Sequence, residues 1–298
     1  RLIDRGHKVI GTCRSPEKTA QLRKQGAEPV VLDAVDARAV REAVGRVEPE
    51  AIIHQATALA DIRFGRNFDR TFAQTNRLRT EGTDSLLAAA REAGVRRFVA
   101  QSFASMRNAR EGSMVKTEDD PLDPDPPAKM REAHAAMRHL EQAVTGADGI
   151  VLRYGGFYGA ANDAMVGPVR KRQFPIVGDG GGYLTVLAIE HEVPAIYNIT
   201  DDEPAPLREW LPVLADALGA KPPRHAPVWL ARLIAGEVAV TMGTDARGAS
   251  NAKAKRELGW TLRYPSWRQG FVEVYARAQP VRAATRAPVH AKIGRTSY

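Results

Sequence analysis

The hydrophobic pattern in the first half of the chain alternates between two periods. Short β-branched and aliphatic runs, such as "KVIGTC" at 8–13 and "AEPVVLD" at 27–33, are typical of strands in a covered sheet. The segments "SPEKTAQLRKQG" at 15–26 and "DARAVREAVGRV" at 36–47 are typical of helices. Alternating strands and helices predict βαβ units, which build a right-handed, doubly wound parallel sheet.

The same alternation continues to about residue 160. Further strands are predicted over 49–57, 95–105 and 149–159, and further helices over 76–94 and 133–146. Beyond this point the pattern changes to a Gly-rich loop, "FPIVGDGGGY", followed by shorter elements.

This change in pattern predicts three parts of the chain. Residues 1–160 are expected to form a Rossmann-like domain, and residues 161–280 a smaller C-terminal substrate lobe. Residues 281–298 are basic and lack periodicity, which predicts a disordered tail. The predicted fold class is therefore α/β, a Rossmann-like doubly wound parallel sheet with a smaller second lobe.

Several residues mark the ends of the predicted helices. Gly6 stands where a helix C-cap usually stands, just before the first strand. Ser15 is a candidate N-cap followed by Pro16 at the first helical position, and Gly26 follows the end of that helix. Asp36 is the candidate N-cap of the next helix.

Composition limits the classes of function. No stretch approaches the roughly twenty apolar residues that span a bilayer, so we expect no membrane association. The single cysteine, Cys13, fits a reducing, cytoplasmic location, and the histidines show no metal-ligand spacing. The net charge of +8 suits a nucleic acid or a phosphorylated small molecule. Because the basic residues are scattered without aromatic interleaving, we expect a small-molecule substrate and no nucleic acid. Whether the chain forms a homodimer stays open.

Five segments, in order along nearly the whole chain, carry a family resemblance. They are "IIHQATAL" (52–59), "EGTDSLLAAAREAGVRRFV" (81–99), "VLRYGGFYG" (151–159), "YNITDDEPAPLREWLPVLADALG" (197–219) and "SNAKAKRELGW" (250–260). Together they resemble the NAD-dependent epimerase/dehydratase family of the extended short-chain dehydrogenase/reductase superfamily. The resemblance implies an NAD(P)-dependent oxidoreductase or epimerase acting on a small carbonyl, alcohol or nucleotide-sugar substrate.

The resemblance also shows an atypical member. The family begins with a strand and a glycine-rich loop that binds the cofactor pyrophosphate at a helix N-terminus, and this chain opens within that helix. We therefore expect the first strand and the Gly-rich loop to be missing from these residues.

The second departure concerns the family's catalytic pair, a Tyr and a Lys four residues apart on one helix face. None of the seven tyrosines has a lysine four residues on. Alignment on Glu141 places Ala133 and Met137 at the two positions. Phe103 occupies the likeliest position of the family's usual Ser/Thr, with Ser102 or Ser105 nearby. The catalytic residues are therefore unknown, and the alternative function is a non-catalytic NADP(H)-binding regulator or sensor.

Polar residues at the predicted strand ends are the candidates for cofactor binding. The strand predicted at 8–13, which corresponds to the family's second strand, ends in Arg14 and Ser15 and carries no acidic residue there. This favours NADP(H) over NAD(H), because a guanidinium suits a 2′-phosphate. The alternative is a solvated arginine and a simple N-cap. The other candidates are Asp33, His54, Gln55, Ala56, Gln101 and Ser102, each of which could equally serve a structural role.

Two tyrosines are candidates for substrate binding. Tyr154 and Tyr158 lie where the strand at 149–159 runs into a loop, so they could line a cleft. Core packing is the favoured alternative for both rings. Asn76 could correspond to an asparagine that kinks the family's active-site helix, but a helix-start asparagine is the favoured interpretation.

Overall fold

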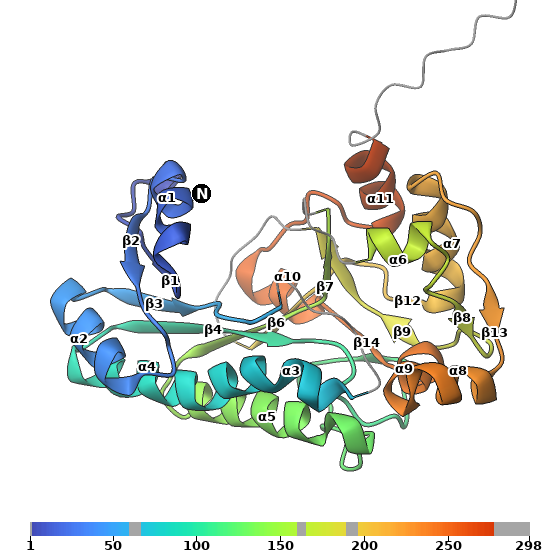
Figure 1. The fold of residues 1–298 in the computed structure, drawn as a ribbon, viewed down its shortest axis with the longest axis horizontal. Helices are drawn as coiled ribbons and strands as arrows, with labels where there is room; N and C mark the ends of the chain where they lie inside the picture. The colour runs from blue at the N-terminus through green and yellow to red at the C-terminus, as the bar shows by residue number, and fades with distance from the viewer. Residues whose placement is uncertain (1, 60–66, 160–164, 189–195, 277–298) are drawn as a thin grey trace, which may run out of the picture.

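The central sheet contains four parallel strands in the order β11–β6–β4–β3 (Figure 1). A computed structural model describes residues 2–59, 67–159, 165–188 and 196–276. The four strands are β3 (Ala51–His54), β4 (Arg97–Phe103), β6 (Ile150–Tyr154) and β11 (Tyr197–Ile199). Because all four run in parallel, their carboxyl ends meet at one edge of the sheet, where α/β proteins bind ligands.

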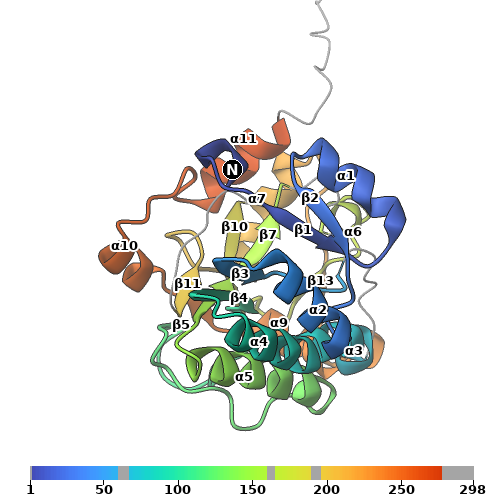
Figure 2. The same ribbon diagram turned by 90° about the vertical axis from the view of Figure 1, so that its left-hand side faces the viewer.

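Helices cover one face of this sheet (Figure 2). They include α2 (Ala37–Val47), α4 (Thr83–Glu92) and α5 (Arg131–Thr145). Their apolar faces pack on the sheet in one core cluster, to which Val40, Leu86, Phe98, Ala100, Leu140 and Val151 belong. Burial of these side chains holds the helices against the strands. As predicted, the side chain of Asp36 caps α2, since it accepts hydrogen bonds from the Arg38 and Ala39 amides.

The first two strands form a separate parallel sheet. Strand β1 (Ile10–Cys13) pairs with β2 (Glu28–Val31) across the short helices η2 (Pro16–Lys18) and α1 (Thr19–Lys24). Within the described residues, β1 pairs only with β2 and β3 pairs only with β4. The chain before β1 contains the single turn η1 (Ile3–Arg5), which ends at Gly6 with φ +86°, as the predicted cap requires.

The helix before β4 is longer than the sequence predicted. It begins at Phe68 rather than Asn76 and runs through α3 (Phe68–Arg77) and a π-helical turn, η3 (Leu78–Gly82), into α4. Its N-cap is Asn67, whose side chain accepts from the Arg70 amide at 3.2 Å. The helix-start interpretation of Asn76 is therefore wrong, because Asn76 is a buried residue in the last turn of α3.

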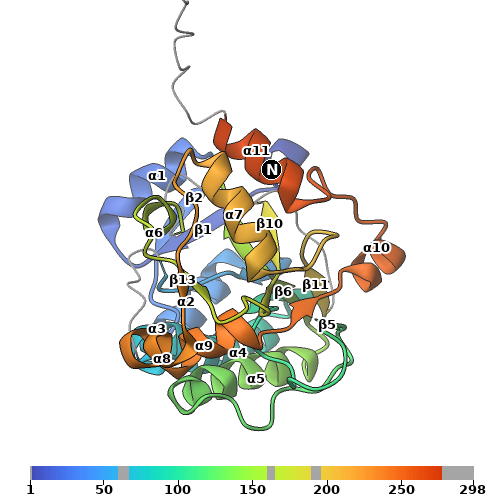
Figure 3. The same cartoon turned by 90° about the vertical axis from the view of Figure 1, so that its right-hand side faces the viewer.

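A second lobe lies beside the sheet (Figures 1 and 3). Its helices are α6 (Val166–Arg170), α7 (Leu207–Ala217), α8 (Val228–Ala235), α9 (Glu237–Thr244) and α11 (Trp267–Ala276), whereas α10 (Ala252–Leu258) packs on β11 of the central sheet. Its strand pairs are β7 (Gly156–Tyr158) with β10 (Val186–Ala188), β8 (Ile176–Val177) with β13 (His225–Ala226), and β9 (Tyr183–Leu184) with β12 (Ala205–Pro206). Trp210, Trp267 and Phe271 are fully buried at its core.

Two further observations concern the limits of the fold. No helix in the described part of the chain is long and apolar enough to cross a membrane. The predicted disordered tail, 281–298, lies outside the described residues.

Candidate active site

Apolar side chains occupy the positions where the family resemblance places its catalytic residues. Phe103 ends β4, and Ala133 and Met137 lie one turn apart on α5. All three belong to one hydrophobic cluster that also contains Met106, Met130, Phe68 and Val238. Ala133 and Met137 are buried, and neither carries a group that can exchange a proton. These three positions therefore hold packed apolar side chains in place of an acid.

A carboxylate from another helix fixes the start of α5. Asp69 on α3 accepts from the backbone N–H of Ala133 at 2.9 Å and of Glu132 at 3.2 Å. The carboxylate satisfies free N–H groups of the first turn of α5 and complements the helix dipole. Sequence reasoning missed Asp69, because its partners lie more than sixty residues away and no local motif connects them.

One turn after Met137 on α5, the buried carboxylate of Glu141 joins this helix to strands β4 and β6. Glu141 accepts from the Ser102 hydroxyl at 2.7 Å and from both Arg153 and Arg107, with Arg107 Nη2 at 2.8 Å and Arg153 Nη2 at 2.9 Å. Burial alone would raise the pKa of Glu141, but hydrogen bonds and charge from Arg107 and then Arg153 outweigh it and lower the pKa to about 2. The Ser102 hydroxyl therefore donates its hydrogen bond to Glu141, on the face of the sheet that α5 covers.

Two polar side chains on the π-containing helix are also buried. Arg79 lies in the π turn, and burial lowers its pKa to about 10 although the charge of Glu141 opposes this shift. The side-chain amide of Asn76, three residues earlier, has no hydrogen-bond partner among the described residues. π turns inside α-helices are frequent at functional sites. This stretch therefore adds a cation and a polar amide to the same side of the sheet.

The predicted cofactor residues on the first sheet lie at strand ends. Arg14 directly follows β1, is exposed and has no partner among the described residues. Ser15 is extended, and its hydroxyl makes no backbone cap bond, so the helix begins at Pro16 without it. Asp33 closes a turn after β2 by accepting from the Val35 amide at 3.2 Å. The roles of these residues in cofactor binding stay predictions.

The remaining cofactor candidates lie at the edge of the central sheet. His54 ends β3, is buried and lies with Nε2 3.1 Å from the Leu78 carbonyl in the π turn. Because a carbonyl can only accept, Nε2 donates this bond, and burial lowers the pKa of His54. Gln55 and Ala56 follow as exposed residues, and Gln101 is half-buried on β4. The structure brings all four to neighbouring strands, and their cofactor roles stay predictions.

Both candidate substrate tyrosines are buried in hydrophobic clusters. Tyr154 packs with Tyr197 and Trp260. Tyr158 lies in the core of the second lobe, with its ring 4.9 Å from that of Phe271 in an edge-on arrangement. This environment suits the packing interpretation of both rings.

The chain matches an NAD(P)H-binding family and is similar to two proteins named as reductases. A family model described as NAD(P)H-binding matches residues 1–172. The 3-diazoavenalumate denitrifying reductase of a Streptomyces species is 40% identical over 286 residues, covering 90% of this chain and 92% of that protein. A 4-hydroxy-2-methyl-3-oxo-4-farnesyl-3,4-dihydroquinoline-1-oxide ketoreductase of Stigmatella aurantiaca is 28% identical over 242 residues, covering 74% and 69%.

Solved structures with low sequence identity share the fold. The UDP-glucose 4-epimerase of Thermotoga maritima, with UDP-glucose, superposes with a TM-score of 0.68 at 18% identity, covering 93% of each chain. The UDP-glucose 4-epimerase of Thermus thermophilus, in complex with NAD, gives a TM-score of 0.65 at 19% identity, covering 92% of each chain. These likenesses establish the Rossmann-like α/β fold.

Proposed function

Because the chain belongs to the family described as NAD(P)H-binding, we propose that it is an NADPH-dependent reductase of aromatic diazo compounds. In this reaction a hydride replaces the diazo group, which leaves as N₂. The proposal draws on the 40% identity to a denitrifying reductase and on the absence of a proton donor at the positions of the family's catalytic pair.

The apolar cluster around Phe103, Ala133 and Met137 is the observation that carries the proposal. Hydride addition to a carbonyl creates an alkoxide, which an acid must protonate in the transition state. A diazo group on an aromatic ring differs, because its nitrogens carry positive charge and hydride addition neutralises that charge. Such a substrate needs no acid at the position of Ala133.

The reaction balances without an additional proton. A reduced nicotinamide, when bound, would supply the hydride. The hydride bonds to the terminal nitrogen of the diazo group, which gives a neutral diazene on the ring. The diazene then breaks its carbon–nitrogen bond, releases N₂ and leaves its hydrogen on the ring carbon. The contribution of this chain is to orient the ring against Phe103, a partly exposed member of the apolar cluster, and to exclude water there.

The end of β1 supports NADPH as the reductant. Arg14 is exposed there without a partner in the described part of the chain, and neither of the two residues that directly follow the strand, Arg14 and Ser15, is acidic. A guanidinium pairs well with a 2′-phosphate. Arg14 therefore favours NADP(H) over NAD(H).

A carbonyl, alcohol or nucleotide-sugar substrate is the rival proposal, since one relative is named as a ketoreductase. That reaction would require a proton donor other than residues 133 and 137. The buried Arg79 is a candidate, but its pKa of about 10 suits stabilisation of a negative charge better than release of a proton. The non-catalytic NADP(H) sensor is the other rival, and it predicts cofactor binding without turnover of any substrate.

The test follows deuterium from the cofactor to the product. The chain is incubated with an aryl diazonium carboxylate and NADPH deuterated at the transferable position, and N₂ and product are measured by mass spectrometry. We expect one N₂ per NADPH consumed, deuterium on the ring carbon, and a rate that changes little between pH 6 and 8 because no side chain donates a proton. Samples without protein correct for spontaneous reduction.

Three outcomes would contradict the proposal. Turnover of carbonyl substrates but not of the diazo compound would favour the carbonyl reductase. NADPH binding without turnover of either class would favour the sensor. A steep pH dependence of the hydride step would require an acid that the apolar cluster does not supply.

A further inference from the structure

Helix α8 carries its largest apolar side chains on the outside of the protein. Trp229, Leu233 and Ile234 are 67%, 62% and 66% exposed, and we call these three residues the α8 face. The small residue Ala231 points the other way and is buried in a core cluster of the second lobe. Burial favours the opposite arrangement, in which large apolar side chains lie inside. The α8 face is therefore an apolar surface that the described residues leave uncovered, and such surfaces mark sites of interaction.

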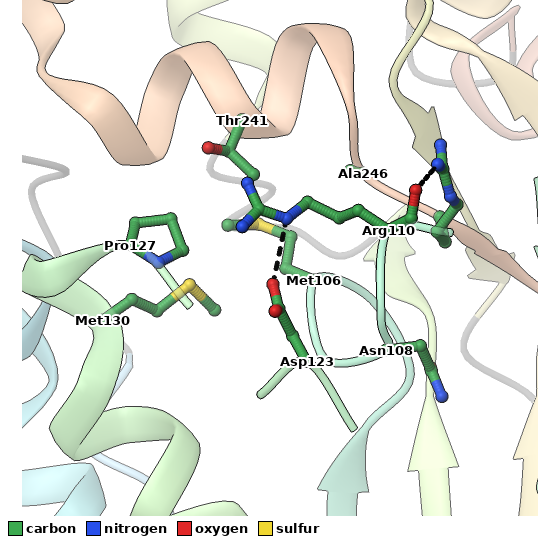
Figure 4. A pocket seen from close by; sticks show the side chains of 9 residues that line it. Met106, Asn108, Arg110, Asp123, Pro127, Met130, Thr241 and Ala246 are labelled. Carbon is green, nitrogen blue, oxygen red and sulfur yellow. Dashed lines mark hydrogen bonds and ion pairs between the residues drawn. The ribbon is translucent and has the colours of Figure 1, made fainter. Parts of the chain in front are cut away.

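The next helix, α9, shows the ordinary arrangement and fixes the position of α8. Val238 and Val240 on α9 are buried, and Val238 belongs to the cluster that contains Met130 and Met137. Figure 4 shows Thr241 of α9 beside a small cavity that Met130 also lines. Helix α8 lies at the outer edge of the second lobe (Figures 1 and 3). The helix pair is thus held to the sheet domain through α9, while the α8 face is directed to the solvent.

The chain before α8 lies against the end of α6. Strand β13, which directly precedes α8, pairs with β8. Arg172, just after α6, donates from Nε to the Pro222 carbonyl at 2.8 Å. The charged residues of these two segments therefore lie on adjoining parts of the surface.

These adjoining segments are positively charged. Residues 165–178 and 219–236 contain no aspartate or glutamate. Arg232 on α8 pairs at 2.7 Å with Glu237, and the other nearby acid along the chain is Asp216 on α7. Four exposed cations of the two segments have no ion-pair partner among the described residues: Arg170, Lys171, Lys221 and Arg224. A partner of the α8 face should therefore be anionic as well as apolar.

Protein partners match the α8 face less well than a lipid surface does. A second copy that paired through α8 across a twofold axis would bring the two sets of unpaired cations together, and like charges repel. A standard protein interface takes about 800 Å² from each partner. One aromatic side chain supplies about 150–250 Å² when it is buried completely, so three side chains that are already partly buried fall well short of that area. A lipid surface requires no matching area on a second protein.

We propose that the α8 face attaches the protein to the surface of an anionic lipid bilayer. An amphipathic helix binds such a surface by placing its apolar side chains at the boundary between headgroups and acyl chains, where a tryptophan ring is favoured. Basic residues beside the helix add attraction to the acidic headgroups. The expectation of no membrane association rested on the length that spans a bilayer, and a helix lying on the surface does not need that length. The attachment is independent of the proposed reaction.

Sedimentation of the full chain with lipid vesicles tests the attachment. Vesicles of phosphatidylcholine alone are compared with vesicles in which about one third of the lipid is phosphatidylglycerol. We expect binding to the anionic vesicles to be about tenfold tighter or more, and to weaken as salt is added. Trp229 is the exposed one of the four tryptophans, because Trp210, Trp260 and Trp267 are buried. Binding should therefore shift the tryptophan fluorescence to shorter wavelength.

A first double variant tests the apolar contribution. Leu233→Ser combined with Ile234→Ser keeps Trp229 as the reporter and should weaken vesicle binding about tenfold, because apolar area drives insertion. Both positions are exposed, so the variant should fold as the unmodified chain does, which circular dichroism checks. Val272→Ser, at an exposed apolar position on α11, is the matched control and should leave binding unchanged.

A second double variant tests the charged contribution. Lys221→Gln combined with Arg224→Gln should weaken binding to the anionic vesicles by roughly fivefold for each charge removed, and should leave binding to the neutral vesicles unchanged. Lys18→Gln combined with Lys24→Gln removes two exposed cations near β1 and lowers the net charge equally. This control should bind as the unmodified chain does.

Equal binding to neutral and anionic vesicles, or binding to neither, would overturn the proposal, and these measurements need no variant. Unchanged vesicle binding by the Leu233→Ser, Ile234→Ser variant would overturn it as well. A dimer that forms without lipid and is dissociated by the same variant, as measured by sedimentation velocity, would assign the α8 face to a second copy. Binding of polyglutamate that depends on Leu233 and Ile234 would assign it to an acidic polypeptide instead.

Discussion

Arg14 is the residue on which the proposed cofactor preference depends. It is exposed, it directly follows β1, and it has no partner in the described part of the chain. Charge-assisted hydrogen bonds are worth about 1.5–3 kcal/mol each. We therefore expect Arg14→Ala to weaken NADPH binding about tenfold to a hundredfold while NADH binding changes little, as measured by fluorescence titration.

The matched control for Arg14 is Lys24→Ala, which removes an exposed cation at the far end of α1. It lowers the net charge by the same amount, so it reports any general electrostatic attraction of the nucleotide. Equal loss of NADPH affinity in both variants, or equal loss of NADPH and NADH affinity in Arg14→Ala, would show that Arg14 does not read the 2′-phosphate.

At the residue scale, short-range relationships could be predicted and long-range ones could not. The Asp36 cap and the glycine turn at Gly6 depend on neighbours a few residues away, so sequence spacing is enough to find them. Asp69 capping α5, and Glu141 shared by Arg107 and Arg153, join residues far apart in sequence. Only the tertiary arrangement of the helices and strands brings those groups together.

At the element scale, the sequence predicted the alternating strands and helices up to about residue 160 but misplaced the start of one helix, and it treated as a loop the segment that contains β8 and the start of β9. "FDRTFAQT" at 68–75 is polar on average and has few apolar residues, so periodicity gives little signal there. Its helical form depends on tertiary contacts: Phe68 and Phe72 stack with ring centroids 4.0 Å apart, and Asp69 bonds to α5. The π turn also has a tertiary contact, because His54 at the end of β3 donates a hydrogen bond to the Leu78 carbonyl.

The ion cluster at Glu141 holds α5 against β4 and β6. Its carboxylate has a pKa of about 2 in the folded chain against an ordinary value of 4.5. A lowered pKa contributes stability that is present above pH 4.5 and is lost as the pH falls toward 2. We expect Glu141→Gln to lower the free energy of unfolding by about 3 kcal/mol at pH 7, because two buried guanidinium groups lose their counter-charge.

Urea unfolding at pH 7 and pH 3 checks this expectation. The difference between the unmodified chain and Glu141→Gln should be smaller at pH 3, where part of the ionic contribution is already lost. Glu132→Gln, an exposed glutamate on the same helix, should change stability by less than about 0.5 kcal/mol. A pH-independent difference would mean that packing, and not the carboxylate charge, accounts for the loss.

At the scale of the whole molecule, the predicted α/β class and parallel topology are confirmed, while the site could be located only in part. Parallel strand order follows from alternating elements, so the edge that gathers His54, Gln101 and Ser102 was predictable. The pairing of β14 (Gly248–Ala249) with β5 (Val115–Lys116) was not, because it joins the chain after α9 to the loop after β4. Contacts between lobes leave no periodic signal in either segment.

The two sheets are expected to differ in stability. Strands β1 and β2 form a two-stranded sheet whose residues are exposed or half-buried, whereas β4 has a paired strand on each side. An isolated two-stranded sheet is marginal in water, so β1 and β2 should open locally at low free-energy cost. Hydrogen–deuterium exchange should therefore be faster in 10–13 and 28–31 than in 97–103, on the order of a hundredfold or more.

The same exchange experiment connects this local opening to cofactor binding. If Arg14 contacts the nucleotide, NADPH should slow exchange in 10–18, because a ligand that binds only the closed form stabilises it by mass action. Helix α7 in the second lobe, remote from β1, serves as the internal control and should change little. Equal protection of β1 and β4 without cofactor would show that the two sheets unfold as one unit. Unchanged exchange in 10–18 at saturating NADPH would place the nucleotide away from Arg14 and remove the physical basis for the proposed NADPH preference.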